Sequence, residues 1–433
     1  MTVGAIGNWQ QKQSFGYPNS SLMYWAIAAC ALPTYVLSAV LPDMAETLRV
    51  SLAEGGAVYA VGASLGFFLL GITAFIVGRV GKAPIFAVGL TALAASMLGL
   101  TLASSFPWFL VWGALMWGAS VITQVMSYSL LAERYPGAVV RYQNVAGVFW
   151  SAGAVVGPLA AGYLAGSSLG WRGAFALVTV FGLGALAYLG LQIAGRKREA
   201  GFSEPGVPAL PSSGAADTIL QLLHTRDFLL LSLGLLFYLG SEITVTGWIS
   251  SFLKEVQQAS SVVAGLGLSV FWLGMGVGRF AVARFLVQRW SPPRLLMLAM
   301  GGGSLAILAA SFVPNALLSL LLFGVTGLFF GGGVPTLTGF LATLFPGLSG
   351  QALSLYFSLG QLGAVVFPAL AGVVASTLGF RVGLSLAALL AWGLVAVAFR
   401  FALDLGRGRP EETPVVGDDG NDRLRLSQVR NRA

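Results

Sequence analysis

The chain has 433 residues, of which 56 % are hydrophobic and 9 % are charged. Soluble domains carry about 25 % charged residues, so most of this chain cannot face water. The net charge of +8 is compatible with nucleic-acid binding, but the basic residues fall in predicted loops and tails. That placement favours a role in membrane orientation, and no nucleic-acid partner is expected.

Cysteine and histidine are too scarce for metal or disulfide chemistry. Cys30 is the single cysteine and His224 the single histidine, which excludes an internal disulfide and a Cys- or His-rich metal site. The stretch from Gly62 to Gly66 matches the Gly-x-Ser-x-Gly hydrolase motif, but it lies inside an apolar segment without a nearby histidine. We therefore expect no enzyme, no catalytic residue, no metal and no cofactor.

Apolar segments follow one another along almost the whole chain. A span needs roughly 20 apolar residues, and such segments fill an N-terminal bundle at 21–195 and a C-terminal bundle at 228–403. Residues 1–20 lack a basic start and a cleavage site, so they are predicted to be a cytoplasmic segment. Residues 196–227 are predicted to be a polar linker, and 404–433 a disordered cytoplasmic tail. The predicted spans are 21–41, 55–77, 83–104, 106–131, 142–166, 172–195, 228–252, 262–287, 293–313, 316–343, 350–376 and 380–403.

The placement of Lys and Arg predicts the orientation. Most of the 24 basic residues lie between spans on the side that also holds both termini. Cytoplasmic loops are enriched in Lys and Arg. We therefore expect a multi-pass protein of the cell inner (plasma) membrane with both termini in the cytoplasm and the lipid bilayer as its surroundings.

The two bundles are related by a sequence repeat. Pro136-Gly137 recurs 210 residues later as Pro346-Gly347, and Gly153-Ala154-Val155-Val156 recurs as Gly363-Ala364-Val365-Val366. Like-oriented repeats give secondary transporters a pseudo-two-fold axis and a solute site near the bilayer midplane. The repeat therefore predicts a transporter of small molecules.

Glu242 is the acidic residue predicted to lie deep inside an apolar span. A charge at the bilayer centre costs about 2.5–3.5 kcal/mol on insertion scales, so such residues usually face a cavity and mark function. Burial disfavours the charged form of a carboxyl group, which suits a group that loads and releases a proton. Arg279, on the next span, should lie about 9 Å nearer the cytoplasm by helical rise. Coupling through substrate or water and a static structural pair therefore both remain open.

Polar residues on several spans form a predicted substrate-binding set. Tyr238 shares a helical face with Glu242, and Asn144 and Ser151 have repeat partners at Ser354 and Gln361. The alternative role for such residues is interhelical hydrogen bonding, worth only about 0.6 kcal/mol on average. The complete predicted set is Gln124, Asn144, Ser151, Tyr238, Trp272, Ser354 and Gln361.

The loop between the second and third spans resembles that of the major facilitator superfamily, which usually reads G-x-x-x-D-R-x-G-R-R. Arg79, Gly81 and Lys82 fit this pattern, whereas Gly78 stands at the acidic position. In the second half, Arg289 alone remains of the motif. The resemblance implies an all-α membrane protein of twelve helices in two pseudo-symmetric six-helix bundles. It also implies a cytoplasmic gate at Arg79, Lys82 and Arg289, which needs another acidic partner here.

Finer features resemble the fucose/galactose/glucose–proton symporter branch. The stretch Tyr238-Leu239-Gly240-Ser241-Glu242 and the pair Gly278-Arg279 resemble its seventh and eighth helices. Two departures are Gly147, where the branch has a histidine, and Thr123 and Gln124, where fucose permeases carry an acid. The resemblance implies proton-coupled movement of a small neutral solute, with a sugar or polyol favoured. Glu242 would couple the proton, and Arg279 would be its charge partner or a substrate ligand.

One motif keeps a second function open. The fifth span contains Gly153-x-x-x-Gly157-Pro158, which also resembles the fifth-helix motif of drug antiporters. Proton-driven export of drugs or hydrophobic metabolites is therefore the alternative to import.

Overall fold

The structure, a computed structural model, describes residues 18–50, 52–165, 167–199, 215–259 and 261–406. These residues form helices without any strand, and twelve of the helices are long and apolar enough to cross a membrane. The all-α prediction is thereby confirmed. Nearly all of the predicted N-terminal segment and C-terminal tail lies outside the described residues.

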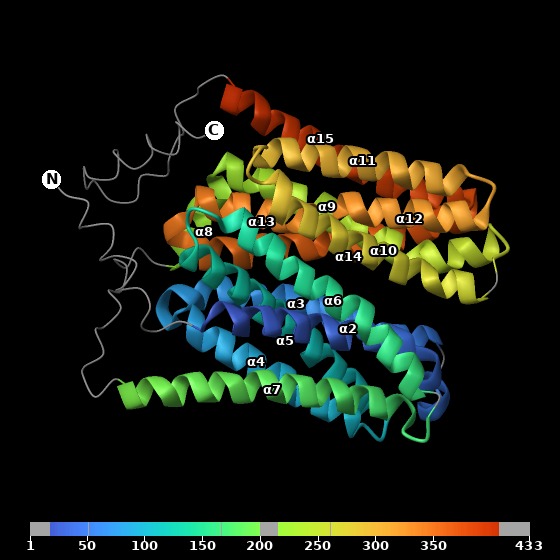
Figure 1. Cartoon of the computed structure of the whole chain (residues 1–433), viewed down its shortest axis with the longest axis horizontal. Coiled ribbons are helices and arrows are strands. Elements are labelled where there is room, and N and C mark those ends of the chain that lie inside the picture. The colour runs from blue at the N-terminus through green and yellow to red at the C-terminus, as the bar shows by residue number, and fades with distance from the viewer. Residues whose placement is uncertain (1–17, 51, 166, 200–214, 260, 407–433) are drawn as a thin grey trace.

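The helices form two groups that lie side by side (Figure 1). The first group is α2 (Ser20–Leu48), α3 (Leu52–Val80), α4 (Lys82–Thr101), α5 (Phe106–Arg134), α6 (Val139–Ala165) and α7 (Gly170–Glu199). The second group is α9 (Arg226–Glu255), α10 (Ser261–Ala281) with the π-helical turn η1 (Val282–Leu286), α11 (Pro292–Phe312), α12 (Ala316–Phe330), α13 (Gly333–Leu344), the 3₁₀ turn η2 (Pro346–Leu348), α14 (Ser349–Leu378) and α15 (Phe380–Gly406).

The packing repeats between the two groups as the sequence does. In the first group α2 packs on α6, α3 on α5, and α4 on α7; in the second, α9 packs on α14, α10 on α12, and α11 on α15. The seams between the groups are related in the same way, since α3 lies against α14 and α6 against α10. The repeat is therefore a pseudo-two-fold symmetry of the whole bundle.

Equivalent arginines make equivalent contacts in the two groups. Arg172, at the start of α7, donates a 2.8 Å hydrogen bond to the carbonyl of Ala103, just past the end of α4. Arg381, at the start of α15, donates to the carbonyl of Ser311 near the end of α11. Each guanidinium therefore satisfies a carbonyl that the end of its neighbouring helix leaves free.

The repeated glycines mark the closest helix contacts. A Cβ at Gly153 would lie 2.9 Å from the carbonyl oxygen of Ala28 on α2. At its repeat partner Gly363 the distance to the carbonyl oxygen of Leu236 on α9 would be 2.1 Å. Small residues let transmembrane helices approach closely, so these glycines fix the spacing of α2–α6 and α9–α14.

Gly363→Ala is expected to destabilise the fold, because the new methyl group meets backbone and not a movable side chain. Overpacking of this kind costs about 1–3 kcal/mol. The unfolding temperature in detergent should fall by several degrees. Gly190→Ala is the matched control, since a Cβ there meets nothing within 4 Å. Equal unfolding temperatures for the two variants would contradict the packing argument.

A short helix lies inside the segment predicted to be a polar linker. Helix α8 (Ala215–His224) buries Ile219 and Leu222 and packs near α3, α9 and α14. It therefore touches both groups at one end of the bundle, where α2 begins and α15 ends (Figure 1). We call this end the linker end and the opposite one the far end.

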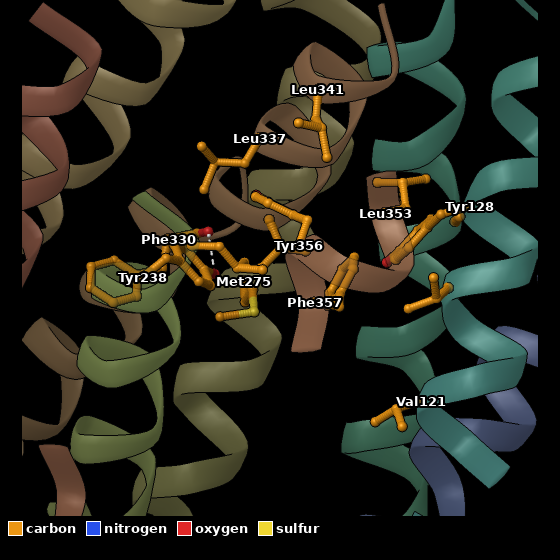
Figure 2. Packing of buried hydrophobic residues seen from close by; sticks show 14 of the residues in the cluster. Val121, Tyr128, Tyr238, Met275, Phe330, Leu337, Leu341, Leu353, Tyr356 and Phe357 are labelled. Atoms are coloured by element: carbon orange, nitrogen blue, oxygen red, sulfur yellow. Dashed lines mark hydrogen bonds between the residues drawn. The ribbon is translucent and has the colours of Figure 1, made fainter. Parts of the chain in front are cut away.

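The tenth predicted span, 316–343, is broken into α12 and α13 at Gly331 and Gly332. Helix α10 passes so closely that a Cβ at Gly331 would lie 2.5 Å from the carbonyl oxygen of Met275. Broken helices at membrane depth are tolerated where other protein groups satisfy the freed backbone. Here the hydroxyl of Tyr238 donates a 2.9 Å hydrogen bond to the carbonyl of Phe330, the last residue of α12 (Figure 2).

Candidate functional site

Glu242 lies in the middle of α9 and is 6 % exposed. Its carboxylate is within hydrogen-bonding reach of the Tyr238 hydroxyl, one turn earlier on the same helix, and it interacts electrostatically with Arg279 of α10. Tyr35 of α2 and Tyr128 of α5 interact with it electrostatically from the first group. The predicted proton-coupling residue therefore lies where the two groups of helices meet.

Arg279 crosses the seam between the groups. Its Nη1 atom donates to the Gly147 carbonyl at 2.8 Å and to the Ser151 hydroxyl at 2.9 Å, both on α6. The residue is 4 % exposed, and its Nε atom has no hydrogen-bond partner. Among the ion pairs of the described residues, none joins Arg279 directly to Glu242. The two charged side chains therefore make no direct ion pair in this structure.

Gly147 makes room for this arginine. A Cβ at Gly147 would lie 2.8 Å from Cδ and 3.0 Å from Nε of Arg279. The position where the symporter branch carries a histidine is therefore filled here by the side chain of Arg279 from the other half. The sequence shows that the histidine is absent, but the side chain that takes its place lies 132 positions later in the chain and reaches Gly147 only in the folded protein.

Aromatic side chains surround the charged pair. The ring of Tyr35 lies 4.8 Å from that of Trp272 and 6.4 Å from that of Trp150, and both contacts are edge-on. Trp272 is 1 % exposed, and its indole N–H has no acceptor. On the other side Tyr128 stacks on Phe357 of α14 with ring centroids 6.2 Å apart (Figure 2). This central cluster thus draws on both groups of helices.

The predicted substrate-binding residues divide into two sets. Ser151, Tyr238 and Trp272 belong to the central cluster, and Gln124 lies beside it, close to the side chain of Tyr128. The others are buried elsewhere along the same helices. Asn144 donates to the Val140 carbonyl and leaves its Oδ1 without a partner, Ser354 bonds the Gly350 carbonyl of its own helix, and Gln361 lies on α14.

Three members of the cluster were not predicted. Tyr35, Tyr128 and Trp150 gave no sequence signal beyond their type, because Tyr and Trp in membrane proteins more often lie at the interface. The position of Trp150 in the middle of the span Val139–Ala161 was the available hint, since an aromatic residue far from both ends of a span cannot be an interface anchor.

A second polar cluster joins the halves at the linker end. The ammonium of Lys82 contacts the Glu133 carboxylate of α5 and donates a 2.6 Å hydrogen bond to the hydroxyl of Ser349, the first residue of α14. Ser129 of α5 also lies 3.3 Å from the Ser349 hydroxyl. A Cβ at Gly350 would lie 2.9 Å from Cε of Lys82. The side chains of Arg79 and Arg289, predicted for the same gate, are exposed.

In the part of the chain that the structure describes, no group of three or more His, Cys, Asp or Glu side chains is placed to hold an ion.

Comparisons with known proteins identify the family. The model of the Major Facilitator Superfamily matches residues 23–325 and 230–431. A curated relative from Saccharomyces cerevisiae, Bypass of stop codon protein 6, is 29 % identical over 206 residues. That match covers 43 % of this chain and only 39 % of the relative's own length.

Solved structures share the fold at low identity. The transporter FucP in its outward conformation has a TM-score of 0.71 at 15 % identity, with 88 % of this chain and 98 % of that chain covered. The human organic anion transporter MFSD10 has a TM-score of 0.70 at 19 % identity, with 88 % of this chain and 98 % of that chain covered. The proton:xylose symporter XylE has a TM-score of 0.69 at 13 % identity, with 88 % of this chain and 94 % of that chain covered. The twelve helices, their two-fold repeat and the family match together make this chain a member of the Major Facilitator Superfamily.

Proposed function

We propose that this transporter moves a small polyhydroxylated solute, a sugar or a polyol, together with protons. The observation that carries the proposal is the buried carboxyl group of Glu242, which lies near Arg279 in a cluster of hydroxyl and aromatic groups from both halves. Buried ionisable groups in transporters commonly serve proton relays. Tyrosine and tryptophan rings suit a sugar, since they offer both a flat apolar face and a hydrogen-bonding group.

The fold neighbours support the same function. FucP is described as the fucose:proton symporter of Escherichia coli, and XylE as a proton:xylose symporter. In this chain the proton would bind Glu242, and Gln124, Ser151, Tyr238 and Trp272 would contact the solute. Asn144, Ser354 and Gln361 would line the path on the linker side of that cluster or beside it.

Alternating access would use the contacts at the linker end. Lys82, Ser349 and Ser129 join the halves there, and the Ser358 hydroxyl donates to the Phe67 carbonyl further along the α3–α14 seam. We assign this arrangement to a state closed toward the cytoplasm, with the linker end and both termini on the cytoplasmic side of the inner (plasma) membrane. Lys82 would be the gate residue, and Glu133 would supply the acid that the loop motif lacks.

Export is the alternative, and its sequence support has a structural explanation. Gly157, like Gly153, packs against a backbone carbonyl of α2: a Cβ at Gly157 would lie 3.1 Å from the carbonyl oxygen of Leu32. The fifth-helix motif shared with drug antiporters is therefore accounted for by close helix packing. It does not by itself favour efflux.

The proposal is tested by solute-induced alkalinisation of the medium around proteoliposomes. Sugars, polyols and sugar acids are added singly, and protein-free vesicles are the control. Proton uptake that depends on one of these solutes is the expected result. A panel without any proton signal, combined with proton-driven removal of a hydrophobic dye from the vesicles, would replace import with export.

A further inference from the structure

The hydrogen-bonding capacity of Arg279 is only partly used in this structure. A guanidinium has five N–H donors, and the hydrogen bonds of Arg279 to Gly147 and Ser151 both involve Nη1. Its buried Nε–H has no acceptor, and neither has the buried indole N–H of Trp272. The Arg279 guanidinium carbon lies 6.0 Å from the centre of the Trp272 ring. Both groups are donors only, so a solute that binds them would offer acceptor oxygens.

Charge compensation around Arg279 is also incomplete. Its direct partners are a carbonyl and a hydroxyl, which are neutral, and its acidic neighbour Glu242 acts without a direct ion pair. The other titratable groups that face Glu242 are the phenols of Tyr35 on α2, Tyr128 on α5 and Tyr238 on its own helix. These phenols are neutral at physiological pH. The charge of the cluster is therefore set by Glu242 and Arg279.

Protonation of Glu242 changes that balance. When Glu242 is charged, the net charge of Glu242 and Arg279 together is zero. When Glu242 is protonated, Arg279 is left as a buried cation whose nearest acid has been neutralised. A buried charge without compensation is costly in a medium of low polarity. The protonated cluster therefore favours an anion at Arg279, and the charged cluster disfavours it.

We propose that the transported solute carries a carboxylate, as a sugar acid or other hydroxy acid does, and that this group binds Arg279 and the Trp272 indole when Glu242 is protonated. The inference rests on the proposed proton-coupled transport and gives its solute a charge, where the sequence predicted a neutral one. A guanidinium matches a carboxylate in geometry and charge. The polyhydroxylated part of the solute would contact the tyrosines.

The stoichiometry of charge follows from this assignment. One proton that moves with one monovalent anion carries no net charge across the membrane, so the transport step is electroneutral. One proton that moves with a neutral sugar carries one positive charge. The membrane potential therefore distinguishes the two cases in the unmodified protein, without reliance on a variant that might fail to fold.

The test uses matched solutes that differ in one carboxylate: glucuronate against glucose, and galacturonate against galactose. Uptake into proteoliposomes is measured under a pH gradient, with and without an inside-negative potential set by potassium and valinomycin. We expect proton-coupled uptake of a sugar acid at a rate that the potential does not change. Proton-coupled uptake of the neutral sugars alone, accelerated by the potential, would overturn the carboxylate assignment and leave the proposed function standing. Proton-coupled uptake of neither member of either pair would overturn both.

Two variants test whether the carboxylate of the solute binds Arg279. Arg279→Gln should weaken sugar-acid binding at least tenfold, which corresponds to about 1.4 kcal/mol, and Arg279→Lys should restore part of it. Arg284→Gln is the matched control, since Arg284 is exposed and lies in the π-helical turn η1 that directly follows α10. In wild type, sugar-acid affinity should fall as the pH rises, because Glu242 then regains its charge. In Glu242→Gln this pH dependence should disappear while binding persists. Unchanged affinity in Arg279→Gln, with a monodisperse protein, would overturn the assignment.

Discussion

Replacement of Glu242 by glutamine is expected to abolish proton-driven accumulation of the solute. Glutamine keeps the size of the side chain and can still hydrogen-bond to Tyr238, but it cannot load and release a proton. A gradient of one pH unit corresponds to about 1.4 kcal/mol, or a tenfold concentration ratio for a coupled solute. With a gradient of two units, wild type should accumulate solute on the order of 100-fold. The variant should only reach the external concentration.

Exchange separates loss of coupling from loss of folding. The glutamine variant should still exchange labelled for unlabelled solute across the membrane, because the rest of the central cluster is intact. Glu255→Gln is the matched control: this carboxyl is exposed at the far end of the same helix, and its loss should leave accumulation unchanged. Accumulation by Glu242→Gln at the wild-type level would assign Glu242 a structural role.

Loss of the Lys82 charge is expected to weaken the closed state of the linker end. In Lys82→Gln the Glu133 carboxylate loses its cation, and the bond to Ser349 of the other half becomes weaker. The Lys82 and Glu133 side chains are 13 % and 34 % exposed, so the full cost of a broken buried pair does not apply. We expect a shift of about 1–2 kcal/mol, a factor of roughly 5–30 in the equilibrium between states.

The shift is measured as a distance between the halves. Cysteines introduced at the exposed positions Arg141 and Arg289 carry spin labels at the linker end of each half. Cys30 is buried and should not compete for label. Lys82→Gln should enlarge the population with long distances, and Glu133→Gln should do the same. Arg79→Ala, which removes an exposed motif arginine, is the comparison. A larger shift from Arg79→Ala than from Lys82→Gln would identify Arg79, and not Lys82, as the gate residue.

Much of the architecture could be predicted because its causes are local. A span of about 20 apolar residues must be helical in a bilayer, since a helix satisfies its own backbone, and this reasoning placed all twelve spans. It did not predict that the span 316–343 is divided into two helices, α12 and α13. The run Gly331-Gly332-Gly333 is a visible signal of the break, but glycine is common in membrane helices. The deciding fact is the close passage of α10.

The central cluster could be predicted only in part, because its members come from different helices. The free-energy cost of placing a charge in the bilayer marks Glu242 and Arg279 as functional candidates, but it is a property of each residue by itself. It says nothing about the partner of either residue, and Arg279 bonds to Gly147, which lies 132 positions earlier in the chain. Tyr35 and Tyr128 are ordinary aromatic residues until the two halves come together.

The sequence by itself thus determined the class of protein, its twelve spans, its two-fold repeat and the buried pair of opposite charges. These features depend on apolar length, spacing and the energetic cost of one side chain in lipid. Only the tertiary structure decided that Arg279 bonds across the seam to α6 and not to Glu242, and that Lys82 takes Glu133 and Ser349 as partners. Such contacts depend on where the helices cross. The crossing depends in turn on how closely two backbones approach, which glycines at the contact permit.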